Sequence, residues 1–428
     1  MRRGLIGARL GHSYSAGLHR TLGGYPYELI EVDELQLAAM MKKKDFSALN
    51  VTIPYKQTVI PWLDELDERA RRIGAVNTIT NDHGHLKGWN TDAAGFEMML
   101  KQAGMDVGGR KVIVLGNGGA AQAVIAVLEE LGAGQIIRVK QRPSAQTLTY
   151  PQAYQLHGDA QVLINTSPVG MAPDYQGCPV DLDRFAQLES VADVIYNPHR
   201  TRLLLQAQQR GLRTAGGLIM LVAQAAEAVR LFDGKLVGQD QILSATADLA
   251  RSTLNLVLVG MPGCGKSTLA RQLAKLSGRP AVDLDQNIVE RTGMPIRTFF
   301  DRYGETAFRE VEAEILAEAC SGSGQIIATG GGVVKSQENI ERLRQSGGVF
   351  FVHRDLDQLQ ADESRPLSRS QSDLQRLYRE RIALYHQAAD FHISNNTTVQ
   401  QCAQQIWSQW QRHADLFINA GIQKGDSQ

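Results

Sequence analysis

The stretch GMPGCGKST, residues 260–268, constrains the fold of this chain more than any other segment. It fits the phosphate-binding pattern G-x-x-x-x-G-K-[ST], and it stands between the apolar run 254–259 and an amphipathic helical pattern. This order of strand, glycine loop and helix is the context in which the motif binds a nucleotide phosphate, and it belongs to a parallel α/β sheet. More than half of the chain precedes the motif, so we expect at least one further domain ahead of it.

The motif predicts a nucleotide-binding site in which each fixed position of the pattern has a defined role. The backbone amides of residues 263–268 would cradle the β-phosphate of ATP, Lys266 would reach the β- and γ-phosphates, and the Ser267 hydroxyl would bind Mg²⁺. The residues that we expect along the nucleotide are Gly263, Cys264, Gly265, Lys266, Ser267 and Thr268.

The length and composition are those of an ordinary globular protein. The 428 residues predict about two or three domains, with 43% hydrophobic and 21% charged residues. The 45 basic and 45 acidic residues balance, which argues against a general nucleic-acid or membrane-surface binder. Four cysteines lack the spacing of a metal site, and the sequence shows neither a signal peptide nor a membrane span. We therefore expect a cytoplasmic protein with reduced thiols.

Apolar runs alternate with helical patterns along most of the chain, which predicts α/β domains with mostly parallel sheets. We expect strands at 3–7 and 48–54, a helix over 60–74, and a strand, glycine turn and helix over 111–133. A polar helical segment gives way to a new strand near Arg251, where we place the main domain boundary. Residues 416–428 lack periodicity and are expected to form a frayed tail.

The glycine turn GNGGAA, residues 116–121, predicts a dinucleotide site in the first half. Glycines there let the backbone approach a pyrophosphate at a helix N-terminus, although such turns also serve packing alone. The following strand ends without the acidic residue that binds an NAD ribose, and it carries Arg138, Lys140 and Arg142 instead. These cations would suit the 2′-phosphate of NADP; the alternative is a solvated basic loop.

Four polar clusters precede this turn, at residues 11–15, 50–56, 74–78 and 88–96. Each alone could be turn chemistry, because Asn and Ser are common in turns. Together they supply hydroxyls, amides, one lysine and one aspartate, which could bind a polyhydroxy acid and move its proton. A lysine close to a carboxylate can serve as general acid/base when its pKa is tuned toward neutrality.

The clusters, the glycine turn and the later stretches NTSPVGM (165–171), YNP (196–198) and MLVAQAAEA (220–228) stand in the order found in shikimate dehydrogenases. Residues 1–245 resemble that family. The resemblance implies reversible reduction of 3-dehydroshikimate to shikimate with NADPH. It also implies a substrate domain, roughly residues 1–100 and 217–250, and a Rossmann NADP-binding domain, roughly residues 101–216.

The family's roles fall on matching positions of this chain. Ser13 and Ser15 would hold the shikimate carboxylate. Lys56 would be the acid/base, and Asp92 beside it would bind a ring hydroxyl and share in proton transfer. The rest of the substrate pocket would consist of Thr52, Asn77, Tyr196 and Gln224. The residues along NADP would be Gly116, Gly118, Gly119, Ala120, Arg142 and Gly217.

The second half carries further signals after its phosphate loop. AVDLDQNI (281–288) and GETAFREVEAEIL (304–316) supply two aspartates and the Arg309–Glu312 pair, which lies at i and i+3 on one helical face. IIATGGGVV (326–334) ends a strand in three glycines, where bare backbone can touch a small substrate. SRPLS and LYRERIALY follow with Arg365 and Arg381. Taken singly, these residues could be a helical salt bridge and solvated arginines.

In this order the motifs resemble shikimate kinases, over residues 254–412. The resemblance implies that Asp285 binds shikimate hydroxyls and orients or deprotonates the attacking 3-hydroxyl. Arg309 and Arg381 would grip the carboxylate, with Gly331 at the ring, because planar, charged guanidinium groups suit a carboxylate clamp. Asp283 would act near Mg²⁺ through water, and Arg365 would reach the ATP phosphates from a lid.

The two resemblances together imply a bifunctional enzyme of the shikimate pathway, which leads to chorismate and the aromatic amino acids. Residues 1–250 would reduce 3-dehydroshikimate, and residues 251–415 would phosphorylate the product to shikimate 3-phosphate. Two alternatives stay open. One half could be catalytically inactive and serve as a binding or regulatory module. The first half could instead be a quinate/shikimate dehydrogenase that uses NAD.

Overall fold

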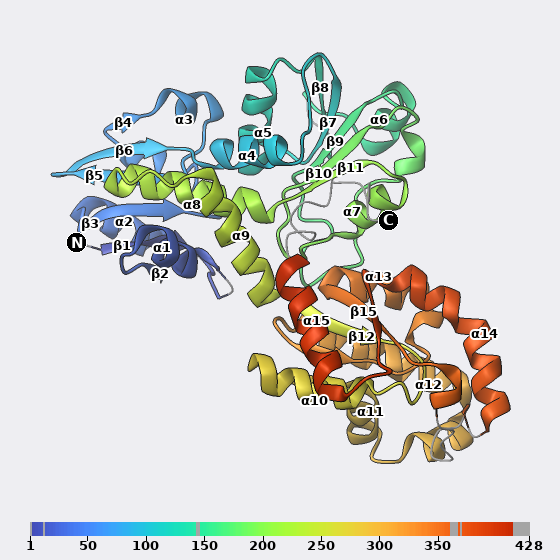
Figure 1. Ribbon diagram of the computed structural model, residues 1–428. Helices are drawn as coiled ribbons and strands as arrows, with labels where there is room; N and C mark the ends of the chain where they lie inside the picture. Colours follow the sequence, from blue (N-terminus) through green and yellow to red (C-terminus); the bar gives the residue numbers. More distant parts are fainter. Residues whose placement is uncertain (1, 12, 143–145, 360–366, 369, 414–428) are drawn as a thin grey trace.

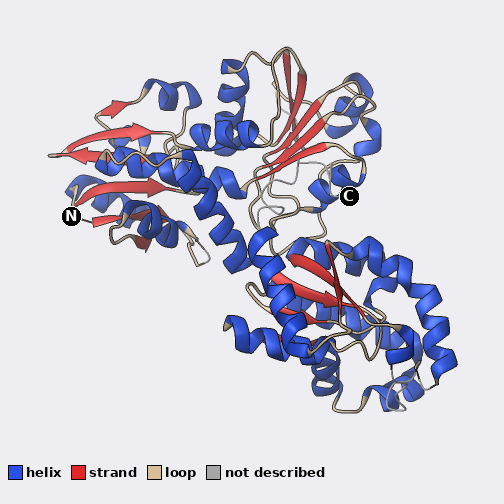
Figure 2. Ribbon diagram, in the orientation of Figure 1, coloured by secondary structure: helices blue, strands red, loops and turns tan. Residues whose placement is uncertain are grey.

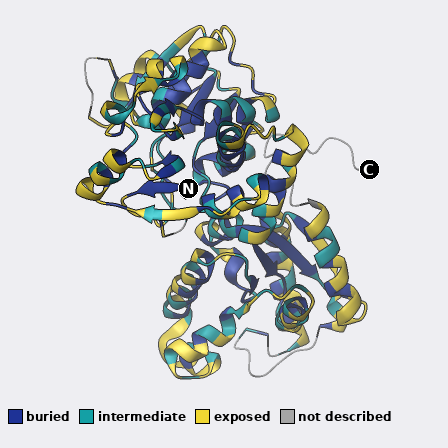
Figure 3. Cartoon of the chain, turned by 90° about the vertical axis from the view of Figure 1, so that its left-hand side faces the viewer, coloured by how far each residue is buried: buried dark blue, intermediate teal, exposed yellow. Residues whose placement is uncertain are grey.

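The computed structural model describes residues 2–11, 13–142, 146–359, 367–368 and 370–413. Three β-sheets follow one another along the chain, each with its own helices (Figure 1). Figure 2 shows the strands inside each part with helices around them, and Figure 3 shows that most strands are buried while exposed residues gather on helices and loops. The expected α/β class is confirmed. None of the described helices is long and apolar enough to cross a membrane.

The first sheet has six strands in the order β2-β1-β3-β5-β6-β4. The strands are β1 (Arg2–Gly7), β2 (Glu28–Glu31), β3 (Phe46–Val51), β4 (Glu65–Leu66), β5 (Thr78–Asp82) and β6 (His85–Trp89). Their helices are α1 (Ser15–Gly23), α2 (Glu34–Lys43) and α3 (Glu68–Ile73). β1 pairs in parallel with β2 and β3, whereas β5 is antiparallel to β3 and β6. Asn50 lies opposite Thr78, so the carboxyl end of β3 meets the segment that enters β5.

The prediction of a helix over residues 60–74 is wrong for the first half of this segment. Residues Ile60–Trp62 form a single 3₁₀ turn, and Glu65–Leu66 pair with β6 as the short strand β4. The α-helix begins only after Asp67, because the Asp67 carboxylate accepts hydrogen bonds from the backbone N–H groups of Arg69 (3.0 Å) and Ala70 (3.4 Å). The cap and the edge-strand pairing therefore override the amphipathic pattern of this segment.

The second sheet is fully parallel, with the strand order β11-β10-β9-β7-β8. The strands are β7 (Lys111–Leu115), β8 (Gln135–Val139), β9 (Val162–Asn165), β10 (Ser190–Asp193) and β11 (Arg213–Gly216). The helices are α5 (Gly119–Glu130), α6 (Tyr150–Leu156) and α7 (Arg202–Gln209). Because β7 lies between β8 and β9, the strand order reverses there, and ligands of such sheets bind at the carboxyl ends of strands at this reversal. The glycine turn follows β7 and lies at that place.

Two long helices join the first two sheets, and a third leads onward. α4 (Asp92–Gln102) packs along α8 (Leu218–Asp233), and α8 packs against α9 (Gln239–Thr253). Figure 1 shows α9 descending from the first two sheets toward the third. Only Leu254 separates α9 from the next strand, and its side chain is buried in the same apolar cluster as that strand.

The third sheet is also fully parallel, in the order β13-β14-β12-β15-β16. Its strands are β12 (Asn255–Val259), β13 (Ala281–Asp283), β14 (Ile326–Ala328), β15 (Gly347–His353) and β16 (Phe391–Ser394). Its helices are α10 (Lys266–Ser277), α11 (Leu284–Thr292), α12 (Ile296–Ser321), α13 (Gln337–Ser346), α14 (Gln371–Ala388) and α15 (Val399–His413). β12 lies between β14 and β15, so the phosphate loop at its carboxyl end again marks a reversal of strand order.

Candidate active sites

A lysine–aspartate pair forms the centre of the first candidate site. Lys56 follows β3, and its Nζ donates a hydrogen bond to Oδ2 of Asp92, the first residue of α4, at 2.6 Å. Asn77, one residue before β5, donates from Nδ2 to the other oxygen of Asp92 at 2.9 Å. The side chains of Lys56 and Asp92 are only 20% and 12% exposed, so the pair is not a solvated surface contact. The expected residues Lys56, Asn77 and Asp92 therefore lie together.

Thr91 joins this group, although the sequence analysis did not single it out. Its backbone N–H donates to Oδ1 of Asn77 at 2.7 Å. Its hydroxyl donates to Oε1 of Gln224 on α8 at 3.4 Å, and this bond brings the expected residue Gln224 to the site. The signal was present in the sequence, because a threonine beside the aspartate in GWNTD places a hydroxyl at the start of the same helix.

The two serines lie at the start of α1. The Ser13 hydroxyl donates to the Ser15 hydroxyl at 3.1 Å and accepts the Ser15 backbone N–H at 3.2 Å. Between them, Tyr14 contacts Tyr196 edge to face, with ring centroids 5.9 Å apart. Burial raises the pKa of both phenols, so both stay protonated and can donate hydrogen bonds. The sequence analysis named Tyr196 but missed Tyr14.

Thr52 lies one residue beyond β3, at the same end of the sheet as Lys56. Its backbone N–H donates to the Ile6 carbonyl at 2.9 Å. A methyl group on Gly7 would lie 2.6 Å from Cγ2 of Thr52, so this glycine leaves room for the threonine side chain. Thr52 is half-buried.

The glycine turn after β7 lies beside the lysine. A methyl group on Gly119, the first residue of α5, would lie 3.6 Å from Cδ of Lys56. Gly116 has φ 108°, which favours glycine, and a methyl group there would lie 2.7 Å from Oγ1 of Thr166. Gly118 is exposed at the helix N-cap, next to Gly119 and Ala120. The helix N-terminus expected to bind a pyrophosphate is thus close to the expected acid/base.

The remaining cofactor candidates lie around the second sheet. Gly217 precedes α8, and a methyl group there would clash with the Val194 carbonyl. Arg138 belongs to β8, while Lys140 and the exposed Arg142 follow its carboxyl end, on the strand that neighbours β7. A basic group therefore stands beside the glycine turn, as expected for a 2′-phosphate site.

The phosphate loop of the second site has the backbone that its motif predicts. Gly263 and Gly265 have φ angles of 80° and 97°, and α10 begins at Lys266. The buried Lys266 Nζ donates to the carbonyls of Gly260 (2.9 Å) and Met261 (3.0 Å). Cys264 is buried, and Asn395 after β16 donates to its carbonyl at 2.7 Å, a contact that the sequence analysis missed. Ser267 is half-buried and Thr268 is exposed in the first turn of α10.

Asp283 and Asp285 stand at the carboxyl end of β13, as the sequence predicts. The Asp283 carboxylate caps α11 by accepting the Asp285 backbone N–H at 3.1 Å. Ser267 and Asp283 could hold Mg²⁺, because this ion binds through one or two protein oxygens together with substrate phosphates and water. Among the described residues, no group of three or more His, Cys, Asp or Glu residues that could hold a metal ion is found.

The three glycines after β14 bring the remaining residues of the second site together. A methyl group on Gly330 would lie 3.0 Å from Oδ1 of Asp285 and 2.8 Å from Oε1 of Glu312. A methyl group on Gly332 would clash with the Arg309 guanidinium. The carbonyl of the middle glycine accepts two hydrogen bonds from α14: Arg381 Nη1 donates to the Gly331 carbonyl at 2.9 Å, and the Tyr385 hydroxyl donates to the same oxygen.

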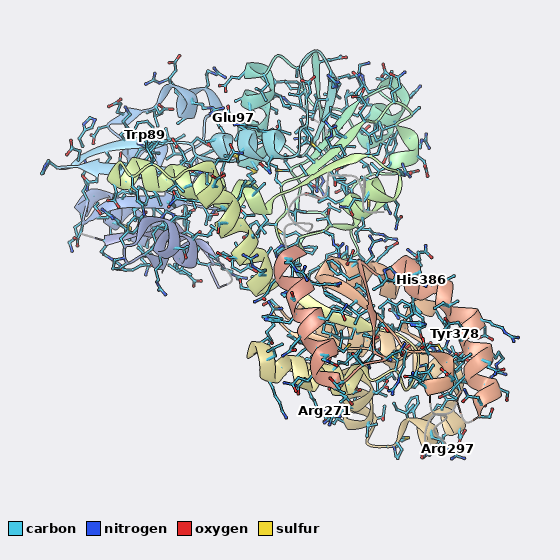
Figure 4. All side chains as sticks on the ribbon, in the orientation of Figure 1. Trp89, Glu97, Arg271, Arg297, Tyr378 and His386 are labelled. Atoms are coloured by element: carbon cyan, nitrogen blue, oxygen red, sulfur yellow. The ribbon has the colours of Figure 1, made fainter. Side chains whose placement is uncertain are left out.

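The expected Arg309–Glu312 pair is present on α12. Arg309 Nη1 lies 2.7 Å from Oε2 of Glu312, which is 1% exposed. Burial raises the pKa of Glu312, while the charge of Arg309 opposes the shift. The 2.7 Å contact with Glu312 thus holds the Arg309 guanidinium beside Gly332. Arg381 lies on α14, which also carries Tyr378 and His386, labelled in Figure 4. Arg365 lies outside the described residues.

Two family models match separate parts of this chain. Residues 5–79 match the model of the shikimate dehydrogenase substrate binding domain, and residues 262–411 match the shikimate kinase model. A shikimate dehydrogenase (NADP(+)) of Halothermothrix orenii is 40% identical over 260 residues, which are 54% of this chain and 90% of that protein.

Solved structures show the same likeness. Shikimate 5-dehydrogenase from Thermus thermophilus, in complex with NADP(H) and shikimate, is 31% identical with a TM-score of 0.52; the match covers 58% of this chain and 99% of that one. Quinate dehydrogenase from Corynebacterium glutamicum, in complex with NAD, is 28% identical with a TM-score of 0.51; that match covers 56% of this chain and 96% of the other.

Proposed function

Because the chain belongs to the shikimate dehydrogenase family and carries a shikimate kinase domain at residues 262–411, we propose that it catalyses two successive reactions. The first is the reduction of 3-dehydroshikimate to shikimate with NADPH, and the second is the phosphorylation of shikimate to shikimate 3-phosphate with ATP and Mg²⁺. The observation that carries this proposal is the presence in one chain of two assembled polar sites, one around Lys56–Asp92 and one around the glycines 330–332.

In the first site, Lys56 is the proton donor to the ring oxygen. NADPH, when bound along Gly116–Ala120, supplies the hydride that makes this oxygen basic. Lys56 lies beside the start of α5, so its Nζ can reach an oxygen held next to the cofactor, and Asp92 keeps the ammonium in place through the 2.6 Å bond. The oxygens and amides of Asn77 and Gln224 orient the ring hydroxyls.

The carboxylate of the substrate would be bound at the opposite end of this site. Ser13 and Ser15 offer hydroxyls that already bond to each other, and the protonated Tyr196 phenol supplies a further donor. Hydroxyl donors favour a carboxylate without the cost of burying a second full charge. Thr52 adds a hydroxyl for the ring from the end of β3.

Arg138, Lys140 and Arg142 support NADP as the cofactor. A phosphate on the 2′-oxygen of the ribose would be attracted by these cations at the end of β8, whereas NAD would leave them without a partner. The likeness to an NAD-bound quinate dehydrogenase makes the opposite preference the direct competitor. A comparison of NAD with NADP, each with shikimate and quinate, separates the two; a strong preference for NAD would contradict the assignment of the three cations.

In the second site, Asp285 accepts the proton of the 3-hydroxyl, and Arg309 and Arg381 bind the carboxylate. ATP with Mg²⁺, held by the phosphate loop, Ser267 and Asp283, supplies the phosphoryl group when bound. The contacts of Gly330, Gly331 and Gly332 with Asp285, Arg381 and Arg309 support this assignment, because bare backbone lets the three side chains approach one small ligand. Lys266 would turn from its two carbonyls to the phosphates.

Two substitutions test whether the sites are separate and active. Lys56→Ala removes the proton donor of the first site and Lys266→Ala removes the phosphate contact of the second, so each variant should lose one activity and keep the other. Rates of shikimate oxidation with NADP and of shikimate phosphorylation with ATP are measured on both proteins. Loss of both activities in either variant would contradict independent sites. A half that is inactive in the unaltered chain would be a binding or regulatory module.

The proposal also covers the organisation and setting of the protein. We propose domain limits near residues 100, 217 and 251, with small-molecule substrates and a cytoplasmic location. The sheets support these limits, because β1–β6, β7–β11 and β12–β16 each close within one of the resulting segments. Limited proteolysis followed by mass spectrometry tests the limits, and cell fractionation tests the location.

A further inference from the structure

A buried arginine is one of the residues that join the third sheet to the rest of the molecule. Arg200 lies in the loop between β10 and α7, which we call the Tyr196 loop (residues 194–201). Its Nη1 lies 2.9 Å from Oδ1 of Asp390, which directly precedes β16. Its Nη2 donates to the Gly347 carbonyl at 2.6 Å and its Nε to the Arg344 carbonyl at 2.8 Å. The loop is thus fixed to the amino end of β15 and to the last turn of α13.

This ion pair is a buried, well-bonded contact. The side chains of Arg200 and Asp390 are 6% and 14% exposed, and the Val349 backbone N–H donates to Oδ2 of Asp390 at 2.9 Å. Burial alone would raise the pKa of Asp390, but Arg200 and Arg344 hold it below its usual value, so the pair is ionised. If one charge of a buried ion pair is removed, the other charge is left uncompensated and the folded protein is strongly destabilised.

The same loop belongs to the dehydrogenase site at its other end. Tyr196 precedes Arg200 by four residues and contacts Tyr14 between the two serines of the carboxylate subsite. Tyr196 also packs against the buried apolar cluster that Leu218 shares with the strands of the third sheet. The loop therefore spans from the substrate site to the kinase domain within a few residues.

A cavity lies where these parts meet. It has a volume of about 1000 Å³, and its lining includes Ser13 and Tyr14, then Asn197 and His199 from the Tyr196 loop, and Cys320 and Gln345 from the kinase helices α12 and α13. The kinase domain thus forms one wall of the space next to the carboxylate subsite. Any shift of the kinase domain would move that wall and the Tyr196 loop together.

We propose that the Arg200–Asp390 ion pair positions the Tyr196 loop, so that the kinase domain forms part of the substrate site of the dehydrogenase. Arg200 is a positioning residue that acts on the substrate through Tyr196 and Tyr14. This inference rests on the proposed function of the first site. It predicts an effect on substrate binding rather than on proton transfer, because Lys56 and Asp92 are held by bonds that do not involve the Tyr196 loop.

Asp390→Asn in the full chain tests the proposal. It keeps the shape of the side chain but removes its charge, so we expect the KM for shikimate in NADP reduction to rise about tenfold, with kcat changed less than about twofold. The kcat/KM of the kinase reaction should stay unchanged. A variant that is merely less stable would show fewer active molecules in both reactions and an unchanged KM.

Three further variants make the result decisive. Asp390→Glu keeps the charge, so its KM for shikimate should lie close to that of the unaltered chain. Glu341→Gln breaks the neighbouring Arg202–Glu341 pair, which joins α7 to α13 in the same interface at 3.1 Å, and should leave the KM unchanged. If Asp390→Asn does not fold, Arg200→Lys replaces it, because lysine keeps the charge but cannot reach both carbonyls and the carboxylate.

The outcomes are distinct. A folded Asp390→Asn or Arg200→Lys protein with an unchanged KM for shikimate would overturn the proposal. An equal rise in KM for Glu341→Gln would also overturn it, because general loosening of the interface would then explain the effect. If the unaltered chain does not oxidise shikimate with NADP, the proposed function fails instead.

Discussion

At the scale of single residues, each site is held together by buried polar groups that satisfy one another. Asp92 uses its two oxygens for different partners, Lys56 on one side and Asn77 on the other. In the kinase site, Glu312 holds Arg309 through Oε2, and its other oxygen lies where a methyl group on Gly330 would be, 2.8 Å away. Such groups are pre-oriented for a ligand, and changing one of them disturbs its neighbours before it disturbs the fold.

Asp92→Asn should damage the dehydrogenase more than its isosteric shape suggests. The amide keeps one acceptor but loses the charge that holds the Lys56 ammonium, so we expect kcat for shikimate oxidation to fall about 100-fold. The kinase activity of the same preparation serves as the internal control. A kcat within about twofold of the unaltered enzyme would show that the carboxylate charge has no role in the reaction.

Gly330→Ala should damage the kinase alone. The added methyl group would lie 2.8 Å from Oε1 of Glu312 and 3.0 Å from Oδ1 of Asp285, and both carboxylates would have to move. We expect the KM for shikimate in phosphorylation to rise at least about tenfold, with unchanged dehydrogenase kinetics. Gly17→Ala is the control, since nothing lies within 4 Å of its added carbon; equal kinase kinetics in both variants would refute the assignment.

At the scale of elements, the sequence predicted the two strand–glycine–helix units well. The apolar strands and the start of each helix at 111–130 and 255–277 are as expected, because glycine patterns and helical periodicity point to the same boundaries. The segment 60–74 was predicted wrongly, since its pattern does not reveal that residues 65–66 pair with β6. The helical pattern of residues 60–66 competes there with strand pairing, and pairing depends on residues distant in the sequence.

In the candidate sites, too, some residues could be predicted from the sequence and others could not. Motif residues such as Lys56 and Asp285 could be named from the sequence, because the chemistry needs their functional groups. Tyr14 and Asn395 could not be named, because their contacts with Tyr196 and the Cys264 carbonyl depend on how loops from different elements meet. The role of the Tyr196 loop as a bridge to the kinase domain depends on tertiary packing in the same way.

The Tyr196 loop, which bridges the two halves, should make the stability of the protein depend on pH. His199 in the Tyr196 loop shares a 2.9 Å hydrogen bond with Oγ1 of Thr253 at the end of α9. Burial, aided by the charge of Arg200, lowers the pKa of His199 to about 4. The unfolded chain therefore binds more protons between pH 6.5 and 4, so the free energy of unfolding should fall by about 3 kcal/mol as the pH drops through this range.

The comparison with His199→Gln isolates this effect. Glutamine stays neutral, so the variant should lose that part of the acid sensitivity and keep the parts caused by other residues. Burial lowers the pKa of His19 to about 3 and raises the pKa of Asp193 to about 7. The protonation of both residues therefore also differs between the folded and the unfolded chain in this pH range. Denaturant unfolding at pH 7 and pH 4 measures the difference. Equal pH dependence in both proteins would contradict the account of His199.

At the scale of the whole molecule, the two active sites do not face each other. The contacts of Arg200 lie at the amino edge of the third sheet, beside the start of β15. The phosphate loop and the glycines 330–332 follow the carboxyl ends of β12 and β14, at the other edge. Strand β12 has five residues, so the edges are about 17 Å apart. Figure 4 shows Arg297, at the start of α12, far from the first two sheets.

Shikimate should therefore leave the first site into solvent before it reaches the second. With isotope-labelled 3-dehydroshikimate and an added pool of unlabelled shikimate, the label in shikimate 3-phosphate should match that of the free pool. An equal mixture of the Lys56→Ala and Lys266→Ala proteins can exchange shikimate only through solvent, so it is the matched control. Product richer in label from the intact chain than from the mixture would show direct transfer between the sites.

The central claim is that one chain carries two working sites for successive reactions. The most direct test supplies the purified protein with 3-dehydroshikimate, NADPH, ATP and Mg²⁺ and follows both products by mass spectrometry. The account predicts shikimate 3-phosphate only when both NADPH and ATP are present, and shikimate alone when ATP is omitted. Shikimate without phosphate in the complete mixture, or phosphorylation of added shikimate without reduction of 3-dehydroshikimate, would contradict it.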